Sequence, residues 1–531
     1  MNLKKSIALI FIALIIFSCA QIVPLTGGEK DIEAPKELES EPLNGSTLFT
    51  DETITIEFDE YIKLTNVSSQ LIISPLMDPA PEVLIKGKKL VIKLKSELAP
   101  NTTYSLNFGN AISDITENNV FPNYKYVFST GTFIDSLSYS GTVINAFDRT
   151  SKENIYVLLY DQFEDSVPLK ELPRYVALTN KKGEFSITNI ANGDYKLFAI
   201  NDVNGNYLFD LPNEEIGFKN DAISIQQSDS NNFIYLFEEE KDLQFLLKSE
   251  HKNYGKIDLV FNRPTEELSI TMLNNEEKEN WGLIEKNNTE DSVVVWLYPE
   301  AFDKEIKLLI KDKEEVIDTI NFDLIERSKM KDSTLTVSSN ITSSFNLDQN
   351  IILKTIRPFS KYNADSITIY EDSVLITNSF FTDIGLKEFE LAYDFKENTS
   401  YQLFIPPNTF EDIYGLKNDT VKLNFKTKKI ADYGVINLTI NPNFTENYIV
   451  QLSQKNKIIK EDYLVGNQKM QYKYLPAGQY SLKIIIDENG DKKWNTGNYL
   501  EGLQPEKVII YQKEIKIRAN WDNDINWTIK E

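Results

Sequence analysis

Short runs of alternating apolar and polar residues extend through most of this sequence, and they limit what the chain can fold into. Thr53-Ile-Thr-Ile-Glu-Phe58 and Lys89-Leu-Val-Ile-Lys-Leu94 are examples, and turn-forming Asn, Gly, Pro and Asp residues bound such runs. A period of two residues places successive side chains on opposite faces, so these runs predict half-buried strands of antiparallel sheets. Sustained helical periodicity is hard to find after residue 20. We therefore predict an all-β protein built from β-sandwiches.

The composition excludes several classes of function. The chain of 531 residues is long enough for several domains of about 100 to 150 residues each. Its formal net charge is -24, and no block of basic residues is interleaved with aromatics, so nucleic acid is not expected as a partner. There is one Cys, Cys19, and one His, His251, which argues against a Cys/His catalytic pair and against ordinary zinc sites. His251 lies in the polar stretch 248–254, which predicts a solvated loop.

The N-terminus predicts export and lipidation. Lys4 and Lys5 precede an apolar run from Ile7 to Phe17, which is too short to span a bilayer and suits the core of a secretory signal. The run ends in Ile16-Phe-Ser-Cys19, which resembles the lipobox of bacterial lipoproteins. That resemblance implies a signal peptide over residues 1–18, acylation of Cys19, and a lipidated tether over residues 19–33. Several acyl chains together hold a protein on a membrane. We expect attachment to the outer membrane through this lipid, on either its periplasmic or its surface face.

Two sequence echoes indicate internal duplication. The segment Asn101-Thr-Thr-Tyr-Ser-Leu106 is echoed by Asn398-Thr-Ser-Tyr-Gln-Leu403, and Asn110-Ala-Ile-Ser-Asp114 by Asn408-Thr-Phe-Glu-Asp412. A second pair, Asp202-Val-Asn-Gly-Asn206 and Asp487-Glu-Asn-Gly-Asp491, follows at an offset of 285 residues. The chain therefore reads as module A, module B, an unassigned segment, A again and B again.

The residues of module A also carry a family resemblance. Asn44-Gly-Ser46, Phe58-Asp-Glu60, Pro100-Asn-Thr-Thr-Tyr104 and Phe128-Ser-Thr-Gly131 resemble the bacterial Ig-like domain of surface-layer proteins. Together with the lipobox they resemble a group of Gram-negative Ig-like-domain lipoproteins. Within that resemblance module B is similar to a transthyretin-like or collagen-adhesin B-type sandwich. The expected domains are an Ig-like domain (34–132), a transthyretin-like β-sandwich (135–237), an unassigned β-sandwich (241–335), a second Ig-like domain (336–429) and a second transthyretin-like β-sandwich (431–531).

The two loops of the second echo are the candidate metal sites. Oxygen-bearing side chains recur in both, and such loops suit Ca²⁺, which accepts six to eight oxygen ligands. The spacing departs from that of an EF-hand, and Asn-Gly is also a strong hairpin-turn signal, so a plain turn is the alternative. Apart from calcium, no cofactor is expected. The candidate ligands are Asp202, Asn204, Asn206 and Asp210 in the first loop and Asp487, Asn489, Asp491, Asn495 and Glu501 in the second.

No motif of a catalytic nucleophile or of a phosphate-binding loop is present, and we expect no enzyme. The adjacent acids Asp59-Glu60 and Glu411-Asp412 are nominal carboxylate pairs, but they are predicted to lie in solvated turns. The expected function is that of a lipid-anchored, non-catalytic scaffold or binding protein of the cell envelope, whose partner is an envelope protein or a surface glycan. The alternative is an accessory lipoprotein subunit of an outer-membrane assembly or secretion complex. An envelope glycan-acting enzyme is a third hypothesis, which the missing catalytic motifs argue against.

Overall fold

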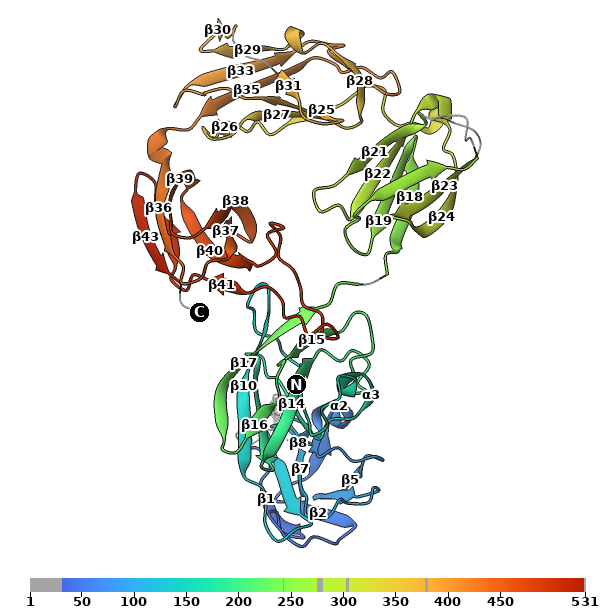
Figure 1. Cartoon of the computed structure of the whole chain (residues 1–531), viewed down its shortest axis with the longest axis vertical. Coiled ribbons are helices and arrows are strands. Elements are labelled where there is room, and N and C mark those ends of the chain that lie inside the picture. Colours follow the sequence, from blue (N-terminus) through green and yellow to red (C-terminus); the bar gives the residue numbers. More distant parts are fainter. Residues whose placement is uncertain (1–30, 242, 275–279, 302–304, 378–380, 530–531) are drawn as a thin grey trace, which may run out of the picture. The chain divides into compact units, whose positions relative to one another are not determined.

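Figure 1 shows the computed structural model of the chain, which describes residues 31–529 except for 242, 275–279, 302–304 and 378–380. Regular structure is almost entirely β-strand, with two short helices, α2 (Val67–Gln70) and α3 (Val167–Lys170), in the described part. The all-β prediction is therefore confirmed. The chain divides into two compact units: a first unit of Met1–Val143, Ser151–Phe209 and Gly217–Ile234, and a second unit of Ile144–Thr150, Asp210–Ile216 and Tyr235–Glu531.

The first sandwich has sheets of strand order β1-β2-β6-β5 and β4-β7-β9, and a small β3-β8 pair. In β2, the buried residues Ile54, Ile56 and Phe58 alternate with more exposed ones, as the period of two predicts. They pack with Leu106 and Phe128 of the second sheet. The strands are β1 (Glu37–Glu41), β2 (Thr53–Phe58), β3 (Ile62–Leu64), β4 (Ile72–Ser74), β5 (Glu82–Lys86), β6 (Lys89–Lys93), β7 (Thr103–Asn107), β8 (Ile112–Asp114) and β9 (Lys125–Ser129).

The second sandwich follows directly along the chain. Its strands have the order β12-β11-β14-β15-β17-β10-β13, and β16 also pairs with β14. Leu158 of β11 and Leu197 of β14 are fully buried, since both strands lie inside the sheet. The strands are β10 (Leu137–Asn145), β11 (Tyr156–Tyr160), β12 (Tyr175–Leu178), β13 (Glu184–Ile190), β14 (Gly193–Ile200), β15 (Glu215–Phe218), β16 (Ile223–Ile225) and β17 (Asp229–Glu238).

The middle segment, which matched nothing nameable in sequence, forms two sheets of order β18-β19-β22-β21 and β20-β23-β24. Leu259, Val295 and Leu308 are among the residues of its own hydrophobic core. The predicted strands Lys256–Phe261 and Ser292–Leu297 are both observed. The strands are β18 (Leu246–Asn253), β19 (Lys256–Phe261), β20 (Leu268–Met272), β21 (Gly282–Lys286), β22 (Ser292–Leu297), β23 (Glu305–Asp312) and β24 (Glu315–Asp323).

The fourth group of strands has a core that includes Leu353, Phe389 and Leu403. Its sheets have the orders β25-β27-β32-β31 and β26-β35-β33-β29-β30, with a β28-β34 pair. The strands are β25 (Val337–Ser339), β26 (Ser344–Phe345), β27 (Ile351–Thr355), β28 (Phe359–Tyr362), β29 (Thr368–Glu371), β30 (Val374–Leu375), β31 (Phe381–Asp383), β32 (Glu388–Leu391), β33 (Ser400–Ile405), β34 (Phe410–Asp412) and β35 (Val421–Thr427).

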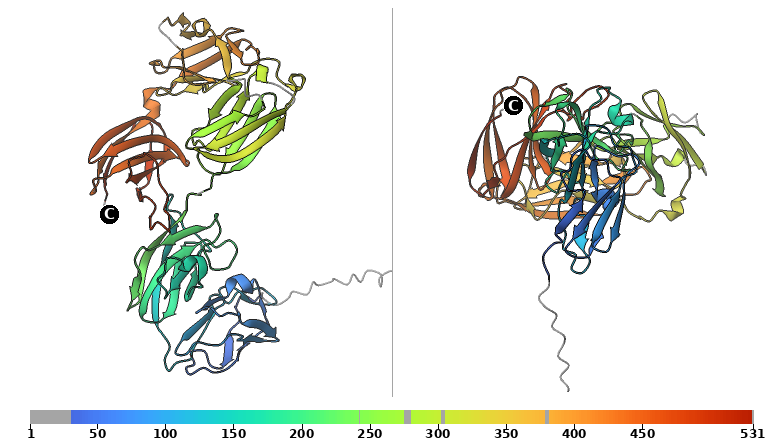
Figure 2. Two further views of the ribbon diagram at one scale, coloured as in Figure 1. Left: turned by 45° about the vertical axis from the view of Figure 1, so that its right-hand side comes forward. Right: turned by 90° about the horizontal axis from the view of Figure 1, so that it is seen from below.

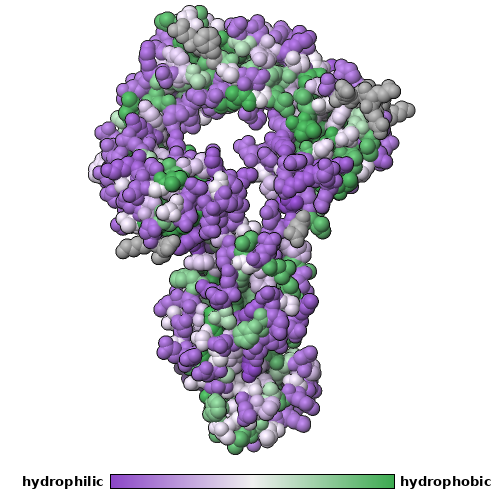
Figure 3. Space-filling view, in the orientation of Figure 1, coloured by the Kyte–Doolittle hydropathy of each residue, from purple (hydrophilic) through white to green (hydrophobic). Residues whose placement is uncertain are grey.

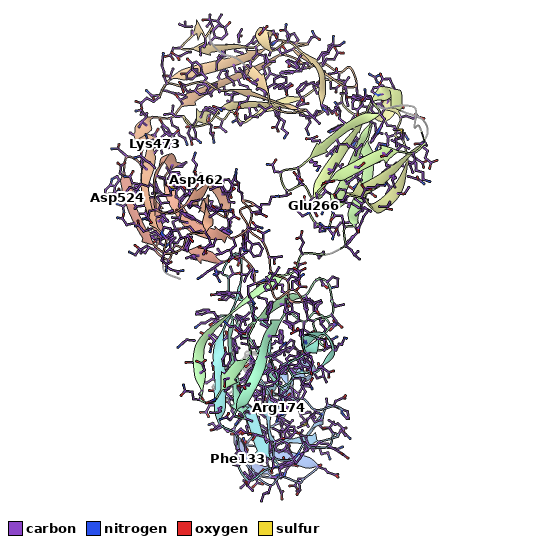
Figure 4. All side chains as sticks on the ribbon, viewed as in Figure 1. Phe133, Arg174, Glu266, Asp462, Lys473 and Asp524 are labelled. Carbon is purple, nitrogen blue, oxygen red and sulfur yellow. The ribbon has the colours of Figure 1, made fainter. Side chains whose placement is uncertain are left out.

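The last group of strands packs the sheets β39-β36-β43 and β38-β37-β40-β41 over one core, and β42 pairs with β40. Along β43, Ile525 and Trp527 are buried, whereas Asp524 is exposed on the opposite face (Figure 4). The strands are β36 (Tyr433–Asn441), β37 (Asn447–Gln454), β38 (Lys457–Val465), β39 (Gln468–Pro476), β40 (Gly478–Asp487), β41 (Val508–Ile510), β42 (Ile515–Ile517) and β43 (Asp522–Thr528). Figure 2 shows from two further sides that strands dominate every part of the chain.

The first sequence echo is a structural repeat as well. The hydroxyl of Tyr104 accepts the main-chain N–H of Ala99 at 2.9 Å, and the hydroxyl of Tyr401 accepts that of Lys396 at 3.0 Å. The asparagines that begin the two echoed segments both adopt a left-handed backbone, with φ of 51° at residue 101 and 53° at residue 398. Asn tolerates this conformation better than most residues, so the shared Asn encodes the shared turn.

Candidate functional site

Cys19, the predicted lipidation site, lies outside the described residues, together with the signal and most of the tether. Within the described part, no helix is both long and apolar enough to cross a membrane. Lipidation of Cys19 therefore stays a prediction from the sequence.

The second Asp/Asn loop connects β40 to β41 and lies entirely in the second unit (Figure 1). Asp487, the last residue of β40, is buried, and its carboxylate accepts the main-chain N–H groups of Gly490 at 2.8 Å and Lys492 at 3.1 Å. Asp491 in turn accepts the N–H of Lys493 at 2.8 Å and the side-chain amide of Asn495 at 3.0 Å. These bonds fold the loop tightly around its own oxygens.

Glu506, which the sequence analysis did not select, completes this loop. Its carboxylate accepts the N–H of Glu488 at 2.9 Å and the N–H of Asn495 at 3.0 Å. Burial raises the pKa of the Glu506 carboxyl, and the nearby negative charges of Asp487 and Asp491 raise it further, although the two main-chain bonds act against them. Three carboxylates therefore influence one another at this position.

Glu501, the acid that was predicted, lies elsewhere. Its main-chain N–H donates to the Asn498 side chain at 3.0 Å, in a turn closed by a bridge between Asn498 and Leu503, and its own side chain is exposed. The structure thus brings Asp487, Asp491 and Glu506 into one loop core and leaves Glu501 on an outer turn. The signal that could have found Glu506 is its place just before the next strand, β41.

The first loop repeats the same backbone. The Asp202 carboxylate accepts the N–H groups of Gly205 at 2.6 Å and Tyr207 at 2.6 Å, matching the bonds that Asp487 accepts from Gly490 and Lys492. Positive φ angles recur at the corresponding positions, 75° at both glycines, 63° at residue 207 and 65° at residue 492. Further along, Glu214 accepts the N–H of Asp210 at 3.0 Å.

These geometries correct one alternative and leave calcium as a proposal. Neither loop is a two-residue hairpin, because β14 ends at Ile200 and β15 begins at Glu215, whereas β40 ends at Asp487 and β41 begins at Val508. Among the described residues, no three His, Cys, Asp or Glu side chains are grouped as a set that could hold a metal. A Ca²⁺ ion in the second loop would need the amide oxygens of Asn489 and Asn495 beside the carboxylates, and calcium accepts such ligands.

His251 does not lie in a solvated loop, as the sequence suggested, but in strand β18. Its Nδ1 is 2.9 Å from the carbonyl oxygen of Lys256, and its Nε2 accepts the N–H of Ile325 at 3.1 Å. The ring therefore carries its proton on Nδ1 and links the β18–β19 hairpin to the segment that follows β24. This role is structural.

The second nominal acid pair is likewise not a solvated turn. Asp412 is buried, accepts the N–H groups of Tyr414 at 2.9 Å and Leu416 at 2.8 Å, and forms an ion pair with Arg357 at 3.2 Å. Its counterpart in the first repeat, Asp114, accepts N–H groups of its own loop in the same manner. Both aspartates hold loops in place.

Comparison with known proteins agrees with this architecture. Residues 31–130 match the family of bacterial Ig-like domains, which confirms the resemblance inferred from module A. No curated protein is similar enough to the chain to count as a relative.

Solved structures with related folds include surface proteins. The chain is 10% identical to the S-layer protein SbsC, with 91% of this chain and 67% of that one covered, at a TM-score of 0.14. It is 10% identical to BcpA, the major pilin subunit of Bacillus cereus, with 74% and 98% covered and a TM-score of 0.14. It is 9% identical to SGBP-B of the mixed-linkage glucan utilization locus of Bacteroides ovatus, solved with a heptasaccharide, with 72% and 91% covered and a TM-score of 0.17. At TM-scores this low, no functional inference rests on these likenesses.

Proposed function

We propose that the protein is a lipid-anchored, non-catalytic scaffold or binding protein of the cell envelope, which presents serial β-sandwiches to an envelope protein or a surface glycan. The observation that carries this proposal is the way in which consecutive sandwiches meet: they pack on each other through specific hydrogen bonds inside each compact unit. A chain of fixed sandwiches suits a spacer that carries a binding surface away from an anchor.

The junction in the first unit centres on Ser74 of β4. The Ser74 hydroxyl accepts the N–H of Val176 in β12 at 2.9 Å and donates to the carbonyl oxygen of the same residue at 3.1 Å. Both Ser74 and Val176 are buried. Asp135, which lies between β9 and β10, also accepts the hydroxyl of Thr103 at 2.8 Å. The two sandwiches of this unit are thus joined by buried polar contacts as well as by the connecting segment.

Two junctions in the second unit use tyrosine hydroxyls. Tyr414 donates to the carbonyl oxygen of Gly255 at 2.9 Å, and the backbone of Gly255 has φ of 66°. Any Cβ at residue 255 would collide with the Tyr414 ring, so glycine fits this contact. Tyr433, at the start of β36, accepts the N–H of Leu347 at 3.0 Å. Each hydroxyl restrains the orientation of one sandwich against the next.

The anchoring half of the proposal rests on the Cys19 motif, and fractionation tests it. Changing Cys19 to Ala should release the protein from the membrane and abolish labelling by a radioactive fatty acid. If the variant stays in the membrane fraction after a salt wash, a protein partner holds it instead of the lipid.

The binding half is tested by a pull-down from the native envelope in mild detergent, followed by mass spectrometry. A partner recovered in substoichiometric amounts, or a glycan, would support the scaffold proposal. Stoichiometric recovery with one outer-membrane assembly or secretion protein would replace it by the alternative, an accessory subunit of such a complex.

A further inference from the structure

A polar groove lies within the first unit, beside the Ser74 junction. Its volume is about 510 Å³, and its walls come from β4, β7, β12 and β13 together with adjacent loops. This size falls within the range of ligand-binding clefts, about 300–1,000 Å³. Because the hydrogen bonds between Ser74 and Val176 hold its floor, the groove is part of the fixed structure of the unit.

The lining is dominated by side chains that both donate and accept hydrogen bonds. Alternate residues Glu184, Ser186 and Thr188 of β13 face the groove, while Phe185 and Ile187 between them are buried in the core. Six carboxamides add to these hydroxyls: Gln70, Asn107, Asn110, Asn123, Asn154 and Asn180. No aromatic side chain is among the described residues that line it, whereas apolar ligands usually bind in aromatic and aliphatic pockets.

One wall of the groove carries a half-buried cation. The ammonium group of Lys125, the first residue of β9, donates to the hydroxyl of Thr188 in β13. Burial lowers the pKa of Lys125, and no acid acts in the opposite direction. Over the part of the chain that the structure describes, no carboxylate lies within ion-pair distance of this ammonium group. A buried charge without a counterion favours an anionic ligand, which would supply charge-assisted hydrogen bonds.

We propose that this groove binds an acidic oligosaccharide, whose hydroxyls meet the carboxamides and whose carboxylate pairs with Lys125. Each carboxamide offers donors and an acceptor, as does each sugar hydroxyl in return, so the lining and the ligand are complementary. An acidic peptide is less well matched, because peptide addition to a sheet uses a strand edge, and β13 presents alternate side chains of one face here. This inference rests on the proposed binding function and names the class of ligand.

The test uses the full-length protein in detergent micelles, titrated calorimetrically with trimers of galacturonate, glucuronate and mannuronate and with their neutral counterparts. At least one uronate trimer should bind about tenfold or more tighter than its neutral counterpart, as expected for a charge-assisted contact. Changing Lys125 to Met should remove that advantage. The matched control is Lys86→Met, which removes the same charge from an exposed position of the same sandwich outside the groove.

A second variant keeps the test decisive if Lys125→Met misfolds. Ser186 is exposed on β13, so Ser186→Trp should fold normally and fill the groove, abolishing binding. Equal affinity for neutral and acidic trimers, no binding of any uronate trimer, or an equal loss in Lys86→Met would overturn the proposal. So would poly-glutamate binding with the same affinity and the same dependence on Lys125, which would assign the groove to acidic peptides. None of these outcomes affects the Cys19 fractionation, so the two proposals fail separately.

Discussion

The carboxylate of Glu506 accepts the main-chain N–H of Asn495 at 3.0 Å. In the other copy of the module, Glu214 makes the same bond to Asp210, also at 3.0 Å. Since Asp210 and Asn495 differ by the 285-residue offset of the repeat, the two glutamates are structural equivalents although they are 292 positions apart, as 506 minus 214 gives. The second loop has gained residues between these points, and the closing acid has kept its role.

This equivalence sharpens the calcium proposal for the second loop. We expect Tb³⁺, which replaces Ca²⁺ at oxygen sites, to luminesce on excitation of Trp494, because the Trp494 indole donates to the carbonyl oxygen of Glu506 at 2.9 Å, beside the loop core. Excess Ca²⁺ should quench the signal. If Ca²⁺ binds only the folded loop, then at about 100 times its Kd it adds about 2.7 kcal/mol to the stability.

Asp487→Ala and Glu506→Gln should abolish the terbium signal, because each removes a buried carboxylate of the loop core. Glu501→Gln is the matched control and should leave it unchanged, as its side chain is exposed on the outer turn. An unaltered signal in Asp487→Ala, or no signal in the unmodified protein, would leave the loop as a self-bonded connection without metal.

The Ser74 junction predicts a specific loss of stability. Ser74→Ala should destabilise the first unit by about 1–3 kcal/mol, since it strands a buried N–H and a buried carbonyl of Val176. Hydrogen exchange at the Val176 amide should accelerate in parallel, which chemical denaturation combined with mass-resolved exchange would detect. The exposed Ser69 is a suitable control, and comparable effects of Ser69→Ala would contradict this account.

Asp114 predicts acid sensitivity of the first sandwich. Burial would raise the pKa of its carboxyl, but N–H groups of residues 117, 118 and 119 outweigh burial and hold that pKa below its ordinary value. The stability contributed by such a group is present above the unfolded pKa of about 3.9 and is lost as the pH falls through the folded value.

Unfolding of the unmodified protein should therefore become easier below about pH 4, and Asp114→Asn should show a smaller dependence on pH in this window. Denaturant midpoints across the acid range measure the effect. Asp51→Asn, at an exposed position of the same sandwich, serves as the control. If both variants follow the same curve, Asp114 is not the group responsible.

The middle segment should fold by itself. A fragment from about Lys241 to about Lys331 is expected to melt cooperatively with a β-type far-UV spectrum, because its two sheets share one core. Within it, His251→Leu should cost about 1–3 kcal/mol, since the Ile325 N–H and the Lys256 carbonyl lose their partner. Exposed Lys252→Leu is the control. A disordered spectrum would show that the segment depends on a neighbouring sandwich.

The sequence by itself determined the strands and the duplication. The strand limits Thr53–Phe58, Lys256–Phe261 and Ser292–Leu297 agree with the structure, because a period of two is a local property of the chain. The left-handed asparagines that start the echoed segments are local in the same sense, since Asn carries its own preference for that backbone.

Only the tertiary structure decided which polar side chains meet. Glu506 in place of Glu501, the partners of His251, and the junction between Ser74 and Val176 all depend on chain closure over 11 to 102 residues. Spacing along the sequence does not encode such distances, because they follow from how sheets and sandwiches pack. The unpaired ammonium group of Lys125 was invisible for the same reason: its isolation is a property of the groove that two sandwiches build around it.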